Sequence, residues 1–219
     1  MLFSVIEMIG TVAFAIAGAM TAIHARMDLL GIVVLGEMTA VGGGCIRDIL
    51  LGRVPAGVFQ NPVYAGVALI PITLIFIILY LDERKDKWID TPVYDRILII
   101  SDAVGLGAFT VTGINVAGEQ GYMGNAFFTI FLGVLTAVGG GIVRDVLAGQ
   151  APSVFRKHIY VSASLAGAVG YYFGRDILRE NAPVVCILVV LTIRVLAYEF
   201  RWELPKIKNQ KKEGEKNEV

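Results

Sequence analysis

Long apolar runs alternate with short polar segments along almost the whole chain. Seven runs approach or exceed the roughly 20 residues that a helix needs to cross a hydrocarbon core about 30 Å thick. They lie at Leu2–Ile23, Leu29–Leu51, Val63–Leu81, Ile97–Ala117, Ala126–Ala148, Ile159–Phe173 and Ala182–Phe200. The pattern predicts an all-α membrane protein with seven transmembrane helices.

The second and fifth runs carry nearly the same sequence. The segment Leu35–Pro55 reads LGEMTAVGGGCIRDILLGRVP, and Leu132–Pro152 reads LGVLTAVGGGIVRDVLAGQAP, so the two align without a gap at an offset of 97. Upstream, at an offset of 95, the residues Glu7, Gly10, Phe14 and Gly18 match Asp102, Gly105, Phe109 and Gly113. Self-similarity of this length indicates an internal structural repeat.

Each copy of the repeat contains three predicted helices, and this odd number fixes the relation between the copies. A second three-helix unit must enter the bilayer from the opposite side, which makes the two copies inverted-topology repeats. We expect a first repeat at residues 1–90, a second, inverted repeat at 91–180 and a seventh helix at 181–205 that has no counterpart. The polar residues 206–219 have almost no apolar side chains, so we expect a disordered cytoplasmic tail.

Lysine and arginine are distributed unevenly among the connecting segments. If the N-terminus is outside, thirteen of them are cytoplasmic: Arg26, Arg84, Lys85, Lys87, Arg96, Arg156, Lys157, Arg201, Lys206, Lys208, Lys211, Lys212 and Lys216. Only three are external: Arg53, Arg175 and Arg179. Cytoplasmic loops carry the excess of positive charge, so we expect a multi-pass membrane protein with the N-terminus outside and the C-terminus in the cytoplasm.

Composition agrees with this class and narrows the function. The 219 residues are 56% apolar and 17% charged, whereas soluble domains have about 45–50% and about 25%. The net charge is zero, so no overall field favours nucleic acid as a partner. The chain has no nucleophile elbow, no Cys/His metal spacing and no phosphate-binding loop. We therefore expect no enzyme, no cofactor and no metal site.

The two glycine triplets, Gly42–Gly44 and Gly139–Gly141, lie in the middle of predicted helices. Each glycine costs roughly 1 kcal/mol relative to alanine in a helix interior. Close helix packing is one explanation of such glycines. The charged residues beside both triplets favour another, in which both helices break and their freed backbone groups face a polar cavity near the midplane.

An arginine and an aspartate follow each triplet: Arg47 and Asp48, then Arg144 and Asp145. A charge at the centre of a membrane helix costs roughly 2.5–3.5 kcal/mol on insertion scales, so these four residues are expected to pair across the repeats or to line a path. Helix neighbours at i and i+1 do not face each other, so we expect each arginine to take its partner from another helix. The possible partners are Asp48, Asp145, Glu7 and Asp102.

The segments FAIAGAMTA, TAVGGGCIRDILLG, SDAVGLGAF and TAVGGGIVRDVLAG resemble the prokaryotic branch of the trimeric intracellular cation (TRIC) channel family. Such sequences are also grouped under a glycine-transporter-like name. The resemblance covers roughly Met1–Phe200. It implies a homotrimer with one pore in each subunit, two inverted three-helix repeats with a seventh helix, and permeation of monovalent cations, chiefly K⁺ with Na⁺. It also implies a location in the plasma (inner) membrane of a prokaryote.

Two functions remain open from these features. In a cation channel, the path would be lined by Thr39, Gly42, Gly43, Gly44, Asp48, Thr136, Gly139, Gly140, Gly141 and Asp145, with Arg47, Arg144, Glu7 and Asp102 forming salt bridges that gate the path or brace the helices. An unpaired arginine would repel a cation, so both arginines should be paired when the path is closed. Inverted repeats fit a secondary transporter of a small amino acid such as glycine equally well. A purely structural scaffold does not explain charges beside glycine triplets.

Overall fold

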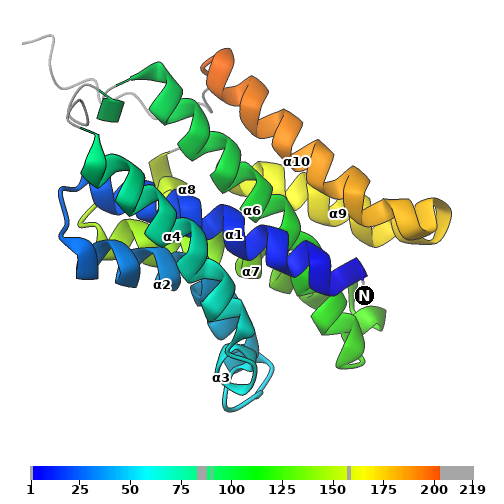
Figure 1. Ribbon diagram of the computed structural model, residues 1–219. Coiled ribbons are helices and arrows are strands. Elements are labelled where there is room, and N and C mark those ends of the chain that lie inside the picture. The colour runs from blue at the N-terminus through cyan, green and yellow to red at the C-terminus, as the bar shows by residue number, and fades with distance from the viewer. Residues whose placement is uncertain (1, 83–87, 90, 157–158, 203–219) are drawn as a thin grey trace, which may run out of the picture.

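The computed structural model describes residues 2–82, 88–89, 91–156 and 159–202 (Figure 1). Within them, seven α-helices have 18 residues or more. These helices are α1 (Leu2–His24), α2 (Leu29–Leu50), α4 (Val63–Leu81), α6 (Pro92–Glu119), α7 (Ala126–Leu147), α9 (Tyr160–Leu178) and α10 (Ala182–Glu199). Four short turns of helix connect them: α3 (Gly57–Gln60), η1 (Tyr122–Gly124), α8 (Ser153–Arg156) and η2 (Arg179–Asn181).

These helices confirm the predicted class, an all-α membrane protein. Six stretches of the described chain are long and apolar enough to cross a membrane, and the last of them, Tyr160–Glu199, contains both α9 and α10. Helix α6 begins five residues before the predicted span, because Thr91 accepts a hydrogen bond from the Tyr94 amide at 3.3 Å and Pro92 occupies the first helical position. The predicted tail at 206–219, with Arg84, Lys85, Lys87 and Lys157, lies outside the described residues.

The ends of α2 and α7 repeat each other at the same offset of 97. Asp28 caps α2 by accepting the Gly31 amide at 2.8 Å, and Asn125 caps α7 by accepting the Phe128 amide at 3.1 Å. Both helices are followed by a glycine with a φ of 69°, Gly52 and Gly149. Only glycine adopts this left-handed conformation without a steric penalty, so the repeated sequence specifies the same start and the same exit for both helices.

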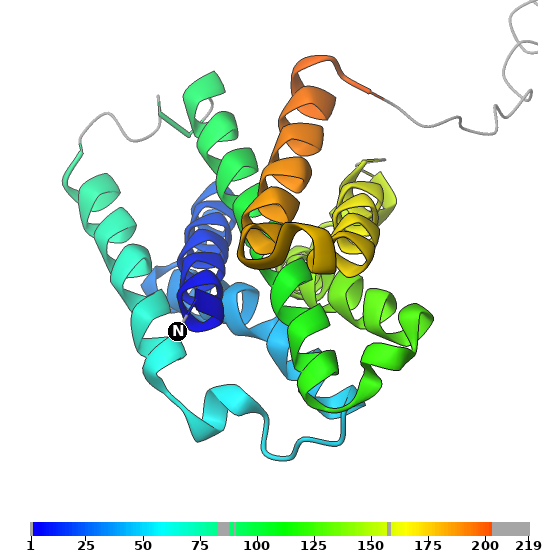
Figure 2. The same cartoon turned by 90° about the vertical axis from the view of Figure 1, so that its right-hand side faces the viewer.

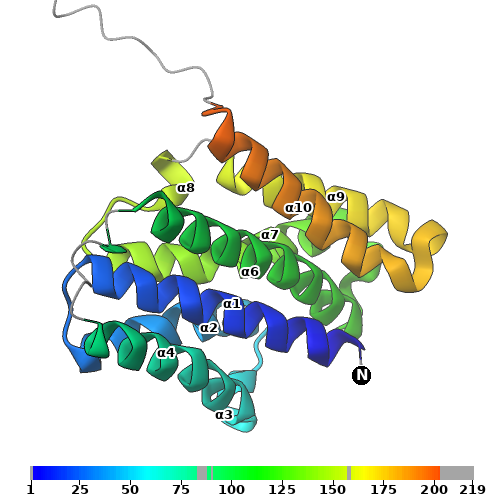
Figure 3. The same ribbon diagram turned by 45° about the horizontal axis from the view of Figure 1, so that its top comes forward.

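Helices α1 and α6 run antiparallel through the centre of the bundle (Figures 1 and 3). Helix α2 packs against α1 and α7 against α6, and α2 and α7 also pack against each other. Helix α4 lies on the α1 and α2 side, while α9 and α10 cover the α6 and α7 side (Figure 2). Among the described helices, α10 packs mainly against α6 and α9.

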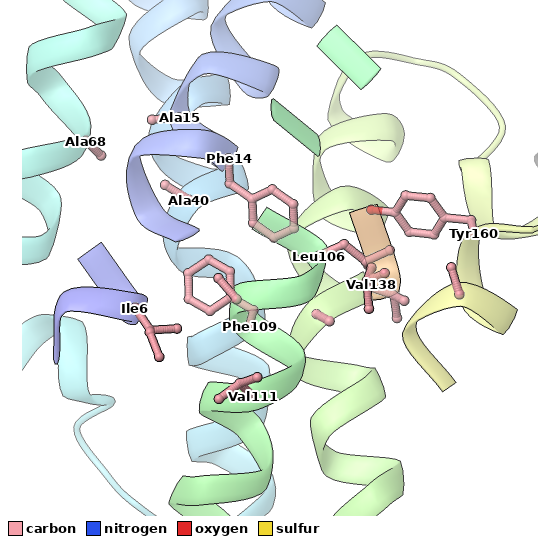
Figure 4. Packing of buried hydrophobic residues seen from close by; sticks show 14 of the residues in the cluster. Ile6, Phe14, Ala15, Ala40, Ala68, Leu106, Phe109, Val111, Val138 and Tyr160 are labelled. Carbon is pink, nitrogen blue, oxygen red and sulfur yellow. The ribbon is translucent and has the colours of Figure 1, made fainter. Parts of the chain in front are cut away.

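Two stacked phenylalanine rings occupy the centre of the core (Figure 4). Phe14 of α1 and Phe109 of α6, equivalent residues of the two repeats, have ring centroids 5.2 Å apart. Gly105 makes this possible, because a Cβ atom there would overlap the Phe14 ring. The outward face of α4 instead exposes large apolar side chains such as Ile70 and Ile78, as expected for a helix in contact with lipid.

Candidate functional site

The first charged cluster joins α1, α2 and the segment after α2. Arg47 Nε donates to Asp48 Oδ1 at 2.8 Å, and Arg47 Nη1 lies 3.8 Å from Glu7 Oε1. The second oxygen of Asp48 accepts the Gly57 amide at 2.7 Å, which fixes the carboxylate against α3. Arg53 Nη1 is 3.8 Å from Asp48 Oδ1 and adds a second cation from the loop. Arg47 and Asp48 are both buried, so the cluster combines buried and partly exposed charges.

The second cluster has the same plan in α6, α7 and the segment after α7. Arg144 Nε donates to Asp145 Oδ1 at 2.9 Å, and Arg144 Nη1 donates to Asp102 Oδ1 at 2.6 Å. The second oxygen of Asp145 accepts the Ser153 amide at 2.6 Å. All three charged side chains are at most 5% exposed. This cluster is therefore tighter and more deeply buried than the first.

Each arginine takes a partner from another helix, as predicted: Arg47 meets Glu7 of α1, and Arg144 meets Asp102 of α6. The predicted pairing across the repeats is not found, because each of these partners belongs to the same repeat as its arginine. Each arginine also bonds to the aspartate directly after it, although Cβ atoms at i and i+1 diverge on a helix. The long arginine side chain turns back over the helix, where a Cβ atom added to Gly44 or Gly141 would lie 3.7 Å from its Nη2 atom. The guanidinium group thus lies beside the last glycine of each triplet, at a distance that would be an ordinary contact for an alanine Cβ atom.

A third arginine, Arg194 of α10, joins the second cluster. Its Nη2 atom lies 3.4 Å from Asp102 Oδ2, and its guanidinium carbon lies 4.7 Å from the centre of the Tyr160 ring. The Tyr160 hydroxyl group is 3.4 Å from Asp102 Oδ1. Arg194 was not among the predicted site residues. It is a charged residue within an otherwise apolar span, which is the signal that could have identified it, but it lies outside the repeated sequence.

Both clusters border cavities at opposite ends of the antiparallel α1/α6 pair. The first cavity, of about 310 Å³, is lined by Glu7, Thr11, Gly44, Arg47, Asp48, Tyr64, Thr112 and Asn115 among others. The second, of about 170 Å³, is lined by Thr21, His24, Tyr94, Asp102, Arg144, Asp145, Gln150 and Arg194 among others. Each cavity therefore has paired carboxylate and guanidinium groups in its wall.

The glycine triplets do not break their helices, contrary to the sequence-based expectation. Helix α2 continues through Gly42–Gly44, and α7 continues through Gly139–Gly141. The triplets lie where the two helices cross. A Cβ atom on Gly43 would overlap the carbonyl oxygen of Thr136, and one on Gly140 would overlap that of Thr39. The close approach of two backbones, rather than release of carbonyl groups, is the physical reason for glycine here.

The threonines at this crossing are fully buried. The Thr39 hydroxyl group donates to the Leu35 carbonyl group, and the Thr136 hydroxyl group donates to the Leu132 carbonyl group, each at 2.6 Å. Neither threonine borders either of the two cavities. Of the triplet residues, Gly44 alone borders the larger cavity. The residues at the centre of the crossing, Thr39, Gly43, Thr136 and Gly140, therefore lie outside the walls of both cavities.

Solved structures of similar sequence identify the fold of this chain. A solved TRIC cation channel is 33% identical to this chain over 96% of this chain and 99% of the other, with a TM-score of 0.78. The TRIC channel from Rhodobacter sphaeroides is 32% identical over 92% and 99%, with a TM-score of 0.80. The chain is thus an α-helical membrane protein with the TRIC channel fold.

Relatives of known sequence and a family model identify the protein family to which the chain belongs. The UPF0126 inner membrane protein YadS of Escherichia coli and the UPF0126 membrane protein YvgT of Bacillus subtilis are each 36% identical to the chain, over 91% and 94% of its length and 93% and 96% of theirs. The model of the family described as "Glycine transporter" matches twice, at residues 4–80 and 99–176. The chain belongs to this family, and α10 lies beyond both matched segments.

Proposed function

We propose that the chain is a monovalent cation channel, permeable to K⁺ and Na⁺, with one path through each subunit. The observation that carries the proposal is the pair of cavities at opposite ends of the α1/α6 pair, each walled by an Arg-Asp motif and an acidic residue from the first helix of its repeat. Carboxylate oxygens attract cations, and arginines paired with them do not repel cations as free charges would. The likeness to TRIC cation channels supports the same function.

The path would run from Glu7 and Asp48 to Asp102 and Asp145, past the crossing of α2 and α7. In the present conformation, close packing at Gly43 and Gly140 closes it. Conduction then requires the two helices to separate or rotate at this crossing, which would bring Thr39 and Thr136 into the path. The backbones of Gly43 and Gly140 lie close together at this crossing, with the Ile46 and Val143 side chains packed beside them, so such a movement would also displace these two side chains.

The arrangement in the membrane is part of the proposal. Residues 1–90 and 91–180 form inverted repeats, residues 181–205 contain the additional helix, and the N-terminus is outside an inner membrane. The two separate matches of one family model and the antiparallel packing of α1 and α6 support this arrangement. We also propose a homotrimer, supported by the trimeric assembly named for the Rhodobacter sphaeroides channel.

A secondary transporter of a small amino acid such as glycine is the second possibility, and the family description favours it. Liposomes that contain the purified protein separate the two. In a channel, K⁺ flux follows the K⁺ gradient, does not saturate at low K⁺ concentration and is unaffected by glycine. A transporter instead shows saturable exchange of labelled glycine for unlabelled glycine. Glycine exchange without K⁺ flux would overturn the channel proposal.

A further inference from the structure

The two repeats place equivalent charged groups around their cavities but differ at one position. Arg53, which lies 3.8 Å from Asp48 in the first cluster, is replaced by Gln150 at the equivalent position of the second repeat. Their backbones are alike, because the amide of Arg53 donates to the Asp48 carbonyl group and that of Gln150 to the Asp145 carbonyl group, each at 2.8 Å. The second loop therefore lacks a cation that the first loop supplies.

Helix α10 supplies a cation to the second cluster from a different direction. Arg194 contacts Asp102 at 3.4 Å and borders the same cavity as Gln150. With it, the second cluster has two carboxylates, Asp102 and Asp145, and two guanidinium groups. The first cluster likewise has Glu7 and Asp48 with Arg47 and Arg53. Both clusters are therefore neutral, although the second achieves this with a residue outside the repeat.

The contacts of Arg194 leave it less firmly held than Arg144. Its Nε atom is buried and has no hydrogen-bond partner among the described residues, and its one ion pair is longer than the 2.6 Å bond from Arg144 to the same aspartate. Stacking on Tyr160 positions the group. Tyr160 is itself 1% exposed, whereas Tyr64, which borders the larger cavity, is partly exposed.

We propose that Arg194 is the residue that sets the charge and positions Asp102 in the second half of the ion path, in place of the loop arginine of the first half. This inference rests on the proposed channel function. Removing the charge of Arg194 lowers the net charge of the second cluster from 0 to −1 and adds to the negative charge of Asp95, which borders the same cavity. A net negative charge at a pore mouth attracts cations, and the effect is strongest at low salt. Helix α10 thereby controls the cation concentration at that end.

Single-channel recording in planar bilayers at low KCl concentration tests the proposal. We expect Arg194→Gln to raise the unitary current roughly twofold to threefold in one direction, since the added charge lies at one end of the path. Restoring the charge from the loop, in the double variant Gln150→Arg with Arg194→Gln, should return the conductance and its symmetry to those of the wild type. Arg179→Gln, which removes an exposed charge before α10 begins, is the matched control and should change neither.

A structural role alone would not make the double variant recover. If Arg194→Gln conducts like the wild type, or if Gln150→Arg fails to restore it while the protein remains folded, the proposal is overturned.

A second measurement does not depend on conduction. Thermal unfolding of each purified variant is compared in KCl and in choline chloride of equal concentration. Only Arg194→Gln should gain stability specifically from K⁺, because its second cluster has a net charge of −1 instead of 0. An equal response of all variants would contradict the charge assignment. If the wild type passes no current, the channel function fails, and this measurement still decides the role of Arg194.

Discussion

Replacing Gly43 with alanine adds one methyl group at the point where α2 and α7 cross. The new Cβ atom would overlap the carbonyl oxygen of Thr136, whereas a carbon and a carbonyl oxygen in favourable contact are about 3.3 Å apart. Because the obstacle is backbone and not a flexible side chain, the helices themselves must move apart. Overpacking of this kind costs about 3 kcal/mol at the upper end of its usual range.

Alanine also favours the helix over glycine by about 1 kcal/mol, so the net loss for Gly43→Ala is about 2 kcal/mol. For a chain of this size, this loss lowers the midpoint of thermal unfolding by about 4–8 °C. The midpoint is measured by thermal unfolding of the purified protein in detergent. Light scattering recorded during the same experiment is the control for aggregation.

The same triplet provides matched controls. A Cβ atom on Gly42 would have its nearest neighbour, a Val143 methyl group, at 3.5 Å, and one on Gly44 would have Arg47 Nη2 at 3.7 Å. Both are ordinary contacts, so Gly42→Ala and Gly44→Ala should leave the midpoint unchanged or raise it. If all three substitutions lower the midpoint alike, the triplet acts through its backbone flexibility, and the packing explanation is refuted.

Three further outcomes follow from the clusters and the core. Asp102→Asn leaves Arg144 buried without its closest partner and should lower the free energy of unfolding by about 3 kcal/mol, measured by thermal unfolding. Glu7→Gln removes a partly exposed contact of 3.8 Å and should lower it by less than about 1 kcal/mol. Equal losses would contradict the difference between the clusters. Gly52→Ala should cost about 1–2 kcal/mol, because φ is 69° and no atom obstructs the new group; an unchanged midpoint would show that the turn relaxes. Phe14→Ala removes a ring that is 1% exposed and should cost about 3–5 kcal/mol, measured in the same way; a loss below about 1 kcal/mol would place the ring outside the core.

The helices and the repeat were predictable because they depend on local patterns. The apolar run Val63–Leu81, bounded by polar residues, predicted the observed ends of α4. The aligned repeats also named Glu7 and Asp102 as possible partners of Arg47 and Arg144, and the structure places one of them beside each arginine, together with the following aspartate. A pattern that occurs twice in one chain carries information that a single copy does not.

The conformation of the glycine triplets was not predictable from local energetics. Helix propensity disfavours glycine in a single helix, but it takes no account of a second backbone packed against that helix. At Gly43 and Gly140, the close contact between α2 and α7 offsets the propensity cost, and the helices remain continuous. Sequence alone does not reveal which helices cross, and so it could not separate packing from breaking.

Arg194 was missed for a related reason. The repeat directed attention to positions that occur twice, and α10 occurs once. Its ion pair with Asp102 joins residues 92 positions apart in the chain, which no short pattern can show. The aligned repeats show that Gln150 occupies the position equivalent to Arg53. The consequence of this difference for the second cluster can be seen only when the position of α10 is known.

Single-channel recording of the purified wild-type protein in planar bilayers, under a gradient of KCl, tests the central claim most directly. The account predicts discrete unitary currents that reverse near the equilibrium potential of K⁺ and are unaffected by glycine. Saturable exchange of glycine in liposomes, with no unitary currents at any voltage, would contradict a channel formed by the two cavities and the crossing between them.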